Sequence, residues 1–172
     1  MDGDAGDGEG AVITIREATI RDHDALWAIL KPVIRAGDVY ALPVDMERER
    51  ALEYWLALGN WVFVAEEGGA IVGSYYLRAN QRGGGAHVCN CGYVTADWAT
   101  GRGVARAMCE HSLEFGKTRG FRAMQFNFVV STNAAALHLW MKLGFVVVGR
   151  LPGAFLHPEL GYVDALVMWR EL

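Results

Sequence analysis

The sequence predicts an α/β protein in which a mixed sheet has helices on both of its faces. Three observations lead to this prediction. Four segments with the apolar or alternating pattern of strands come first, with two helical patterns among them. A glycine-rich turn then joins the fourth strand to an amphipathic helix. A strand, another helix and two more strands follow, an order that lacks the regular strand–helix alternation of a doubly wound fold.

The first half of the chain is expected to contain two helices. Thr19 can cap the first, whose apolar residues recur at helical spacing; Pro32 should kink or shorten it, and Gly37 should end it. The second is expected over residues 43–58, with Asp45 as its cap. The strands of this half are expected at 12–17, 61–65, 70–77 and 87–95, with a hairpin turn at 66–69.

The second half should alternate helix and strand before it ends in two strands. The expected elements are a helix to about Arg119, a strand over 124–130, a helix from Asn133 to Leu143, and strands over 145–148 and 162–169. A glycine directly follows each helix and can close it. Residues 151–161 contain two prolines and two glycines, so they are expected to form a loop.

Length and composition favour one globular domain over residues 12–172. Residues 1–11 are acidic and glycine-rich, lack the layout of a signal peptide, and are expected to be a disordered tail. The net charge of −4 argues against a nucleic-acid partner. No apolar run approaches the roughly 20 residues that cross a bilayer. The three cysteines suggest no disulfide scaffold, which favours a reducing cytoplasm.

The most informative stretch is Thr100–Arg106, which reads TGRGVAR. It lies between a predicted strand and a predicted helix. Glycines at such a turn let several backbone N–H groups point at one spot, at a helix N-terminus whose dipole favours anions. The stretch therefore predicts a phosphate cradle, although a glycine turn alone is weak evidence because many such turns hold no phosphate.

Two other phosphate-binding motifs do not fit this stretch. A P-loop requires Gly-Lys-Ser/Thr after its glycines, and none is present. A dinucleotide-binding fingerprint would come near the start of a βαβ unit, with an acidic residue about 20 positions further on. Here four predicted strands come first.

A second motif, Asn133–Phe145, reads NAAALHLWMKLGF. Together the two motifs resemble the signatures of the GNAT family of acetyl-CoA-dependent N-acetyltransferases. Thr100–Ala105 matches the first signature, Gln/Arg-x-x-Gly-x-Gly/Ala, and Asn133–Phe145 matches the second, Asn-x-x-Ala-x-x-Leu-Tyr-x-x-x-Gly-Phe. The resemblance covers residues 12–170. It implies the GNAT fold, a mixed, mostly antiparallel seven-stranded sheet with helices on both faces.

The chain departs from the family pattern at two positions. Thr100 replaces the usual Gln or Arg, which should weaken rather than abolish binding because the cradle contacts are mostly backbone N–H groups. Trp140 replaces the Tyr that protonates the leaving thiolate in many family members. An indole N–H cannot act as an acid near neutral pH. Another group or water must therefore perform that step.

The resemblance implies which residues hold acetyl-CoA. Backbone groups of Val94 and Thr95, where two parallel strands separate in this family, would pair with the pantetheine arm. Arg102 and Arg106 would add charge to the cradle, or are solvated surface arginines. Asn133 is a helix cap, a CoA contact, or both. The expected contacts are Val94, Thr95, Gly101, Arg102, Gly103, Val104, Ala105, Arg106, Asn133 and Trp140.

Within the family, the sequence resembles fungal and bacterial acetyltransferases that act on proline analogues such as L-azetidine-2-carboxylate. The residues that carry this resemblance are Asn90, 126–129, Asn133, 149–154 and 161–165. It implies that two catalytic residues, Asn90 and Asn127, hold the substrate's carboxylate or the thioester carbonyl. The alternative is that Asn127, between two phenylalanines that point to the other face of the strand, is a core amide satisfied by backbone.

No general base stands out in the sequence. His138, His157, Glu159 and Asp164 are candidates, and a water chain would serve equally because a secondary amine only has to lose its proton before attack.

A metal site is weakly suggested by His87, Cys89 and Cys91, which share one face of a predicted strand. Zinc needs a fourth ligand and usually turn-borne spacing, so we expect no metal. Cys109 lies in the apolar stripe of a predicted helix and is expected in the core.

The sequence therefore predicts a cytoplasmic acetyltransferase that uses acetyl-CoA to acetylate a small amine, such as an amino acid or a toxic proline analogue. The helices at 24–34 and 43–58 should form the substrate-side wall. A homodimer is expected by resemblance, with no nucleic-acid or membrane partner. The alternatives are an enzyme for antibiotics, which the acidic run 47–53 would suit, an enzyme for protein N-termini, and a non-catalytic acyl-CoA sensor, which the Trp140 departure suggests.

Overall fold

A single seven-stranded sheet organises the molecule, and the computed structural model describes residues 12–172 of it. The tail expected at 1–11 lies outside the described residues. The strand order is β1-β2-β3-β4-β5-β7-β6, and all neighbours are antiparallel except β4 and β5, which are parallel. The strands are β1 (Thr14–Glu17), β2 (Trp61–Glu67), β3 (Ala70–Ala79), β4 (Val88–Thr95), β5 (Ala123–Val130), β6 (Val146–His157) and β7 (Gly161–Glu171). The predicted mixed, mostly antiparallel sheet is confirmed.

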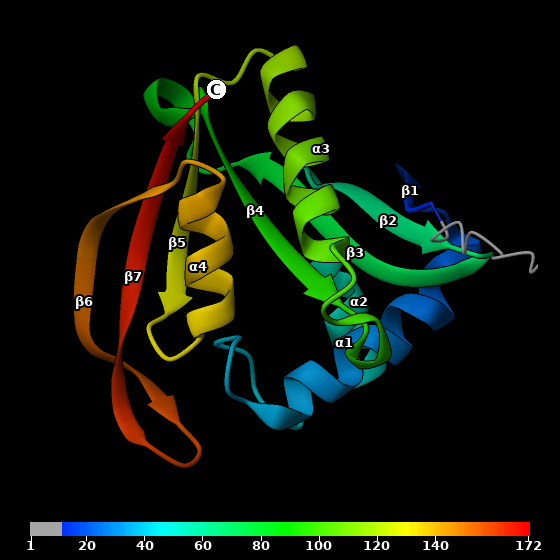
Figure 1. Cartoon of the computed structure of the whole chain (residues 1–172), viewed down its shortest axis with the longest axis horizontal. Helices are drawn as coiled ribbons and strands as arrows, with labels where there is room; N and C mark the ends of the chain where they lie inside the picture. The colour runs from blue at the N-terminus through cyan, green and yellow to red at the C-terminus, as the bar shows by residue number, and fades with distance from the viewer. Residues whose placement is uncertain (1–11) are drawn as a thin grey trace, which may run out of the picture.

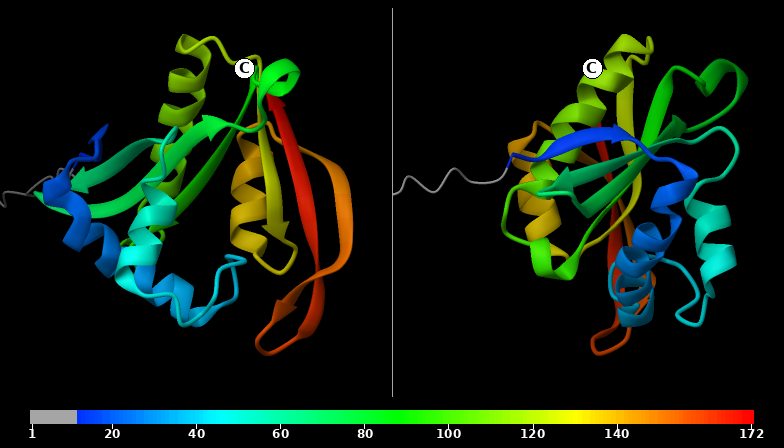
Figure 2. Two further views of the ribbon diagram at one scale, coloured as in Figure 1. Left: turned by 180° about the vertical axis from the view of Figure 1, so that it is seen from behind. Right: turned by 90° about the vertical axis from the view of Figure 1, so that its right-hand side faces the viewer.

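Helices cover both faces of this sheet (Figure 1 and Figure 2). They are α1 (His23–Ala36), α2 (Arg48–Trp55), α3 (Val104–Thr118) and α4 (Ala134–Lys142). On one face, the Trp55 indole of α2 donates a hydrogen bond to Ser74 of β3 at 2.9 Å. On the other face, Val104 and Met108 of α3 lie so close to Gly73 that an added Cβ would meet them at 2.9 to 3.0 Å. Even-numbered residues of β3 therefore face α1 and α2, and odd-numbered residues face α3.

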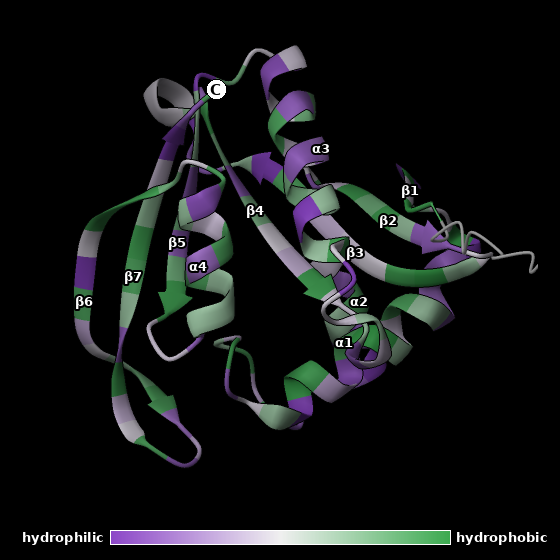
Figure 3. Ribbon diagram, viewed as in Figure 1, coloured by the Kyte–Doolittle hydropathy of each residue, from purple (hydrophilic) through white to green (hydrophobic). Residues whose placement is uncertain are grey.

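The amphipathic pattern of α3 fixes the position of the turn that precedes it. Hydrophobic and hydrophilic residues form bands around this helix (Figure 3). Its buried residues include Met108, Cys109 and Leu113, and Cys109 is fully buried, as the sequence predicted. Because this stripe packs on β3 and β4, the turn at the start of α3 is held at the end of β4.

Helix α2 is shorter than the sequence predicted. It spans Arg48–Trp55 with Glu47 as the N-cap, so the prediction of a helix over 43–58 capped by Asp45 is wrong at both ends. The Arg35 guanidinium donates to the Val44 carbonyl at 2.6 Å and to the Met46 carbonyl at 2.8 Å. These bonds stabilise a turn that precedes the helix, and they come from the last turn of α1.

Strand β6 continues through the segment that was predicted to be a loop. It runs over Val146–His157 at the edge of the sheet, so the loop prediction for 151–161 is wrong over 151–157, and a turn is present only at 158–160. Its register against β7 shifts between Leu151 and Phe155, and Pro152 and Gly153 lie inside that shift. Proline has no backbone N–H to donate. A bulge in an edge strand accommodates it, because no hydrogen bond between two central strands is lost there.

The first helix agrees better with its prediction. A 3-10 turn over Ile20–Asp22 follows Thr19, and α1 then continues past Pro32 to Ala36, so the proline does not shorten it. Gly37 ends the helix in the left-handed conformation, as expected.

Within residues 12–172, no helix has both the length and the apolar character needed to span a membrane.

Candidate active site

Strands β4 and β5 pair only at their beginnings and then separate. The parallel ladder joins Val88 to Ala123 and Cys89 to Met124, and extends no further along the described strands. From there β4 stays with β3, and β5 stays with β7 (Figure 1). One edge of β4 is left without a partner strand, and its polar backbone groups require another partner.

The alternation of the β3–β4 ladder identifies the backbone groups on that edge. The Asn80 N–H donates to the Val88 carbonyl and the Ala96 N–H donates to the Val72 carbonyl, both at 2.8 Å. The register between these bonds has no shift, so the even-numbered residues of β4 pair with β3. The residues whose N–H and C=O groups face β5 are therefore Cys91, Tyr93 and Thr95.

A cleft of about 930 Å³ follows this separation. Its walls are β4, β5, the segment between α1 and α2, the turn before α3 and part of α4. All the residues that the sequence predicted as catalytic or cofactor-binding line it, except Arg102. The structure thus brings together residues from Asn90 to Trp140 that lie far apart in the chain. Thr95 has its backbone on the unpaired edge, whereas the backbone of Val94 pairs with β3.

The turn before α3 has the conformation that an anion cradle needs. Gly101 and Gly103 have φ values of 79° and 82°, which a residue with a side chain rarely adopts. The Ala107 N–H makes the first intrahelical bond of α3, to the Gly103 carbonyl. The N–H groups of Val104 to Arg106 therefore have no partner within the helix and point out of its N-terminus. This end of the cleft therefore presents the backbone donors that an anion such as a phosphate group requires.

Three polar side chains of the cradle are already engaged within the protein. The Thr100 hydroxyl donates to the Asp97 carbonyl at 2.8 Å, so it supports the turn. Arg102 pairs with Glu67 at 3.2 Å, and its guanidinium carbon lies 5.8 Å from the centre of the Trp98 ring. Arg106 pairs with Glu110 of the next helical turn at 2.9 Å. Of the two arginines, only Arg106 lines the cleft.

The two predicted catalytic asparagines meet at Gln125 of β5. The Asn90 side-chain nitrogen donates to the Gln125 carbonyl at 2.9 Å. The Gln125 side chain donates to Asn127 Oδ1 at 2.9 Å, and Asn127 Nδ2 donates to Asn80 Oδ1 at 2.7 Å. Asn90 is buried, but Asn127 is exposed and lies in a register shift of β5, so Asn127 is not a core amide.

Asn133 and Trp140 project from α4 into the same cleft. The Asn133 side chain caps α4 by accepting a hydrogen bond from the Ala136 N–H at 3.3 Å. Trp140 is 8% exposed, and its ring centre lies 5.0 Å from that of Tyr93 and 5.2 Å from that of Phe126. The indole therefore packs as part of an aromatic wall.

Several residues of the cleft were not predicted from the sequence, and four of them carry polar groups on its acceptor side. Asp38 and Tyr40 come from the segment between α1 and α2, and the Tyr40 hydroxyl donates to the Tyr93 carbonyl on the unpaired edge of β4. Tyr76 and Arg78 come from β3. Arg78 could have been predicted as a site residue, because it is a charged residue near the end of an otherwise apolar strand. Residues 38–42, which contain Asp38 and Tyr40, lie between the two predicted helices and carry no motif, so they gave no signal.

The four general-base candidates of the sequence lie away from this cleft. None of them is among its lining residues. His157 accepts the backbone N–H groups of Glu159 and Leu160, and Asp164 pairs with Arg150 at 2.9 Å. The carboxylates that do line the cleft are Asp38 and Asp97.

The cysteines of β4 and α3 are structural. Cys89, Cys91 and Cys109 are all buried between the sheet and α3. Burial raises the pKa of the Cys89 and Cys109 thiols to about 12, and it raises the pKa of Cys91 well above its usual range. The thiols are therefore protonated and unreactive near neutral pH. Across residues 12–172, no cluster of three or more His, Cys, Asp or Glu side chains could hold a metal ion.

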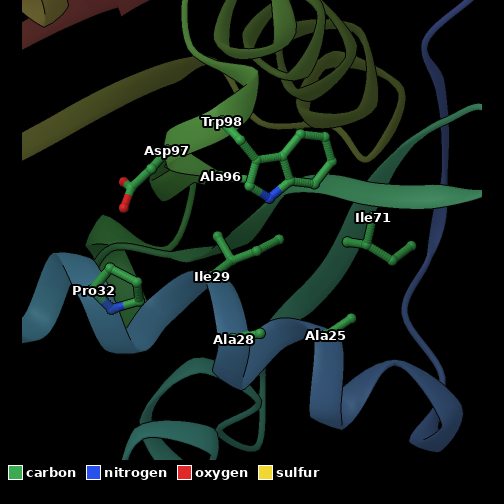
Figure 4. Close-up of a pocket in the computed structure, with 8 residues that line it drawn as sticks. All are labelled: Ala25, Ala28, Ile29, Pro32, Ile71, Ala96, Asp97 and Trp98. Atoms are coloured by element: carbon green, nitrogen blue, oxygen red, sulfur yellow. The ribbon is translucent and has the colours of Figure 1, made fainter.

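A second, smaller hollow of about 170 Å³ lies between α1 and the turn after β4 (Figure 4). It is lined by Ala25, Ala28, Ile29, Pro32, Ile71, Ala96, Asp97 and Trp98. Apart from Asp97, its side chains are apolar, so it lacks the convergent polar groups of a reaction site. The large cleft is therefore the candidate active site.

The fold, the separated parallel strands and the glycine turn at the end of the cleft define an acyl-CoA-dependent N-acetyltransferase. Residues 26–145 match the sequence profile of the acetyltransferase (GNAT) family, and the chain belongs to that family. The cosubstrate of the family is acetyl-CoA, in agreement with the sequence prediction.

Two solved structures and one curated protein illustrate this similarity. A GCN5-related N-acetyltransferase from Kribbella flavida has a TM-score of 0.89 and 38% identity over 93% of this chain and 98% of that chain. A GNAT superfamily phosphinothricin acetyltransferase from Sinorhizobium meliloti, in complex with acetyl-CoA, has a TM-score of 0.80 and 22% identity over 93% and 88%. N-acetyltransferase aca1 of Schizosaccharomyces pombe is 29% identical over 130 residues, 75% of this chain. The chain spans 59% of the length of that relative.

Proposed function

We propose that this chain transfers the acetyl group of acetyl-CoA to the amine of a small amino acid or proline analogue. The observation that carries this proposal is the covered acceptor side of the cleft. Tyr40 reaches across to the Tyr93 carbonyl. Tyr54 and Tyr76 line the wall beside it, with their hydroxyl oxygens 3.4 Å apart. A cleft covered in this way favours a small acceptor over a protein segment.

The two asparagines at Gln125 support the same class of acceptor. Asn90 and Asn127 line the cleft where the strands begin to separate, at the opposite end from the cradle. Their amides can donate to a thioester carbonyl or a carboxylate without adding charge. Both are among the residues that carry the resemblance to the acetyltransferases of proline analogues.

The proposed reaction is direct attack. The lone pair of the neutral amine attacks the thioester carbon, the C–N bond forms, and the C–S bond breaks as CoA thiolate leaves. The developing oxyanion needs donors, which Asn90, Asn127 and the free N–H groups of β4 can supply. Water protonates the thiolate, because the Trp140 N–H is not an acid near neutral pH.

We also propose that Asp38 accepts the proton of the amine. It lines the acceptor side of the cleft, is half-buried, and makes no ion pair with any residue that the structure describes. Asp97, the other carboxylate of the cleft, adjoins the cradle instead. Asp38 is thus the carboxylate on the side from which an amine would approach.

The alternative acceptors fit the cleft less well. A polycationic antibiotic favours an acidic groove, but the charged side chains of this cleft are two carboxylates and two arginines. The acidic run at 47–53 lies outside it, where Glu47 pairs with Arg35 and Glu53 pairs with Arg50. That run is therefore a solvated helix face, not a substrate groove.

Release of free CoA thiol from acetyl-CoA, measured with a panel of amines, tests the proposal. The panel should include azetidine-2-carboxylate, proline, other small amino acids, an aminoglycoside and a peptide with a free N-terminus. Turnover should be largest with the small amino acids. Turnover confined to the aminoglycoside or the peptide would contradict the proposed acceptor. Tight CoA binding without turnover of any amine would favour a non-catalytic acyl-CoA sensor.

We propose that residues 12–172 form one acetyltransferase domain, that it works in the cytoplasm in detoxification, and that it forms a homodimer. The edge strand β6 supports the dimer, because Val146, Val147 and Val148 are 47–58% exposed and a second copy would cover them. Light scattering of the purified protein measures the oligomeric state directly.

A further inference from the structure

We infer that Arg78 is the anchor for the carboxylate of the acceptor, an inference that rests on the proposed function. Arg78 lies on β3 directly opposite Asn90 of β4, so the two side chains share one face of the sheet. Both line the large cleft. A cation therefore stands beside the predicted catalytic amide, on the face that α1 and α2 cover.

The Tyr76 ring supports this guanidinium. The Arg78 guanidinium carbon lies 5.4 Å from the centre of the Tyr76 ring, a cation–π distance. Tyr76 in turn lies across Gly92 of β4, where an added Cβ would come within 2.5 to 2.8 Å of the ring atoms. The missing side chain at Gly92 therefore lets the ring extend toward the cleft with the arginine against it.

Arg78 has no anionic partner among the residues that the structure describes, unlike most arginines around the site. Arg35, Arg102 and Arg106 pair with carboxylates at 3.4, 3.2 and 2.9 Å. No described carboxylate, Asp38 of the same cleft included, lies within ion-pair distance of Arg78. A guanidinium offers a planar fork of N–H donors that matches a carboxylate, so its missing partner is expected to be a ligand anion.

The position of Arg78 excludes the phosphates of CoA as that anion. Arg78 is level with Asn90, whereas the cradle follows Thr95, five residues further along β4. At about 3.3 Å per residue, the separation is roughly 16 Å. An acetyl-CoA whose pyrophosphate lies in the cradle would present its acetyl end toward Arg78. An α-amino acid carries its carboxylate on the carbon next to the amine, so an anchored carboxylate would orient the amine.

The test compares two acceptors of nearly the same shape, azetidine-2-carboxylate and its uncharged carboxamide, at a pH where both amines are largely neutral. Wild type should prefer the carboxylate by about 10- to 100-fold in kcat/KM, the size expected for a charge-assisted hydrogen bond. Arg78→Gln should abolish this preference by raising KM for the carboxylate alone. Arg78→Lys should restore part of it. Arg82→Gln, in the exposed loop after β3, is the matched control and should behave as wild type.

The possible outcomes separate this inference from the proposed function. If Arg78→Gln keeps the carboxylate preference, Arg78 is not the anchor, although the acceptor class stands. If wild type acetylates both acceptors equally well, no carboxylate anchor exists. If wild type turns over only amines unrelated to amino acids, the proposed function and the anchor both fail. The Kd of acetyl-CoA for Arg78→Gln should equal that of wild type, which shows that the variant is folded.

Discussion

The Asn90 side-chain nitrogen donates to the backbone carbonyl oxygen of Gln125 at 2.9 Å. This bond lies one residue beyond the last pair of the β4–β5 ladder, Cys89 with Met124. A side chain thus replaces the backbone ladder at the point where the two strands separate. Because Asn90 also lines the cleft, the residue that holds the strands together at the opening belongs to the candidate active site.

Asn127→Ala should lower turnover while leaving the affinity for acetyl-CoA unchanged. Asn127 is held by Gln125 and Asn80 at the acceptor end, far from the cradle. We expect kcat to fall by about 100-fold, the usual cost of removing one oxyanion donor, and the Kd of acetyl-CoA to stay constant. Steady-state kinetics and calorimetry measure these two quantities.

Asn80→Ala is the matched control for that prediction. Asn80 orients Asn127 at 2.7 Å but does not line the cleft, so its loss should reduce kcat much less. Equal losses of turnover and CoA affinity in Asn127→Ala would argue against its role at the acceptor end.

Gly101→Ala should weaken the binding of CoA. The φ of 79° at Gly101 disfavours a side chain, so the turn must relax and its N–H groups must move. We expect a stability loss of about 1–2 kcal/mol and a rise of about 10-fold in the Kd of CoA. Gly59→Ala is the control, since Gly59 has a φ of 94° and also has open space around it. Gly59→Ala should lose similar stability but keep its CoA affinity. If the Kd of CoA also rose in Gly59→Ala, the effect of Gly101→Ala would not come from the cradle.

Most of the fold was predictable because the local signals agreed with the tertiary structure. The two errors came from partners that lie outside the predicted element itself. Arg35 holds residues 44–46 out of the helix that they favour locally, and pairing with β7 draws Pro152 and Gly153 into an edge strand. Neither partner is visible in the short window of sequence on which a helix or loop prediction depends.

The donor half of the cleft was predictable from motifs, but of the acceptor half only Asn90 and Asn127 were predicted. The cradle is a continuous stretch with its own turn chemistry. Arg78 and Asp38 reach the cleft only because β3 lies beside β4 and the segment after α1 crosses the acceptor side. Their functional setting depends on strand register and on a segment without regular structure. A sequence pattern shows neither the strand register nor the path of that segment.

Gly92→Ala should impair the acceptor end selectively. The new Cβ would lie 2.5 to 2.8 Å from atoms of the Tyr76 ring, so the ring and the Arg78 guanidinium against it must shift. We expect KM for the acceptor to rise by about 10-fold or more and stability to fall by about 1–3 kcal/mol. The Kd of acetyl-CoA should not change. Gly84→Ala is the control, because a Cβ added at Gly84 would meet no atom within 4 Å. An unaltered KM for the acceptor in Gly92→Ala would show that Tyr76 does not shape the site.

Asp22 should make folding stability depend on acid pH. Hydrogen bonds from Arg16 lower the pKa of this buried carboxyl to about 2, against 3.8 for an unperturbed group. Because the folded pKa is the lower one, the stabilisation is complete above about pH 4 and is lost as the pH falls toward 2. Arg16 is half-exposed, so we expect an effect on the order of 1 kcal/mol.

Urea unfolding at several pH values measures that effect. Asp22→Asn should lower the free energy of unfolding at pH 5 and flatten its decline between pH 4 and pH 2. Asp24→Asn is the control, because Asp24 pairs with Arg48 but is 92% exposed, and it should follow wild type. An unchanged acid slope in Asp22→Asn would mean that other carboxyl groups dominate.

Asp38→Asn should slow acetyl transfer without changing the binding of acetyl-CoA. The amide keeps the shape of the carboxylate but cannot accept the proton of the amine, so we expect kcat/KM to fall by about 100-fold. The defect should shrink as pH rises, because a growing fraction of the acceptor is then already neutral. Asp97→Asn removes the other carboxylate of the cleft and should leave this pH profile unchanged. If the loss in Asp38→Asn is small at every pH, a chain of water molecules removes the proton instead.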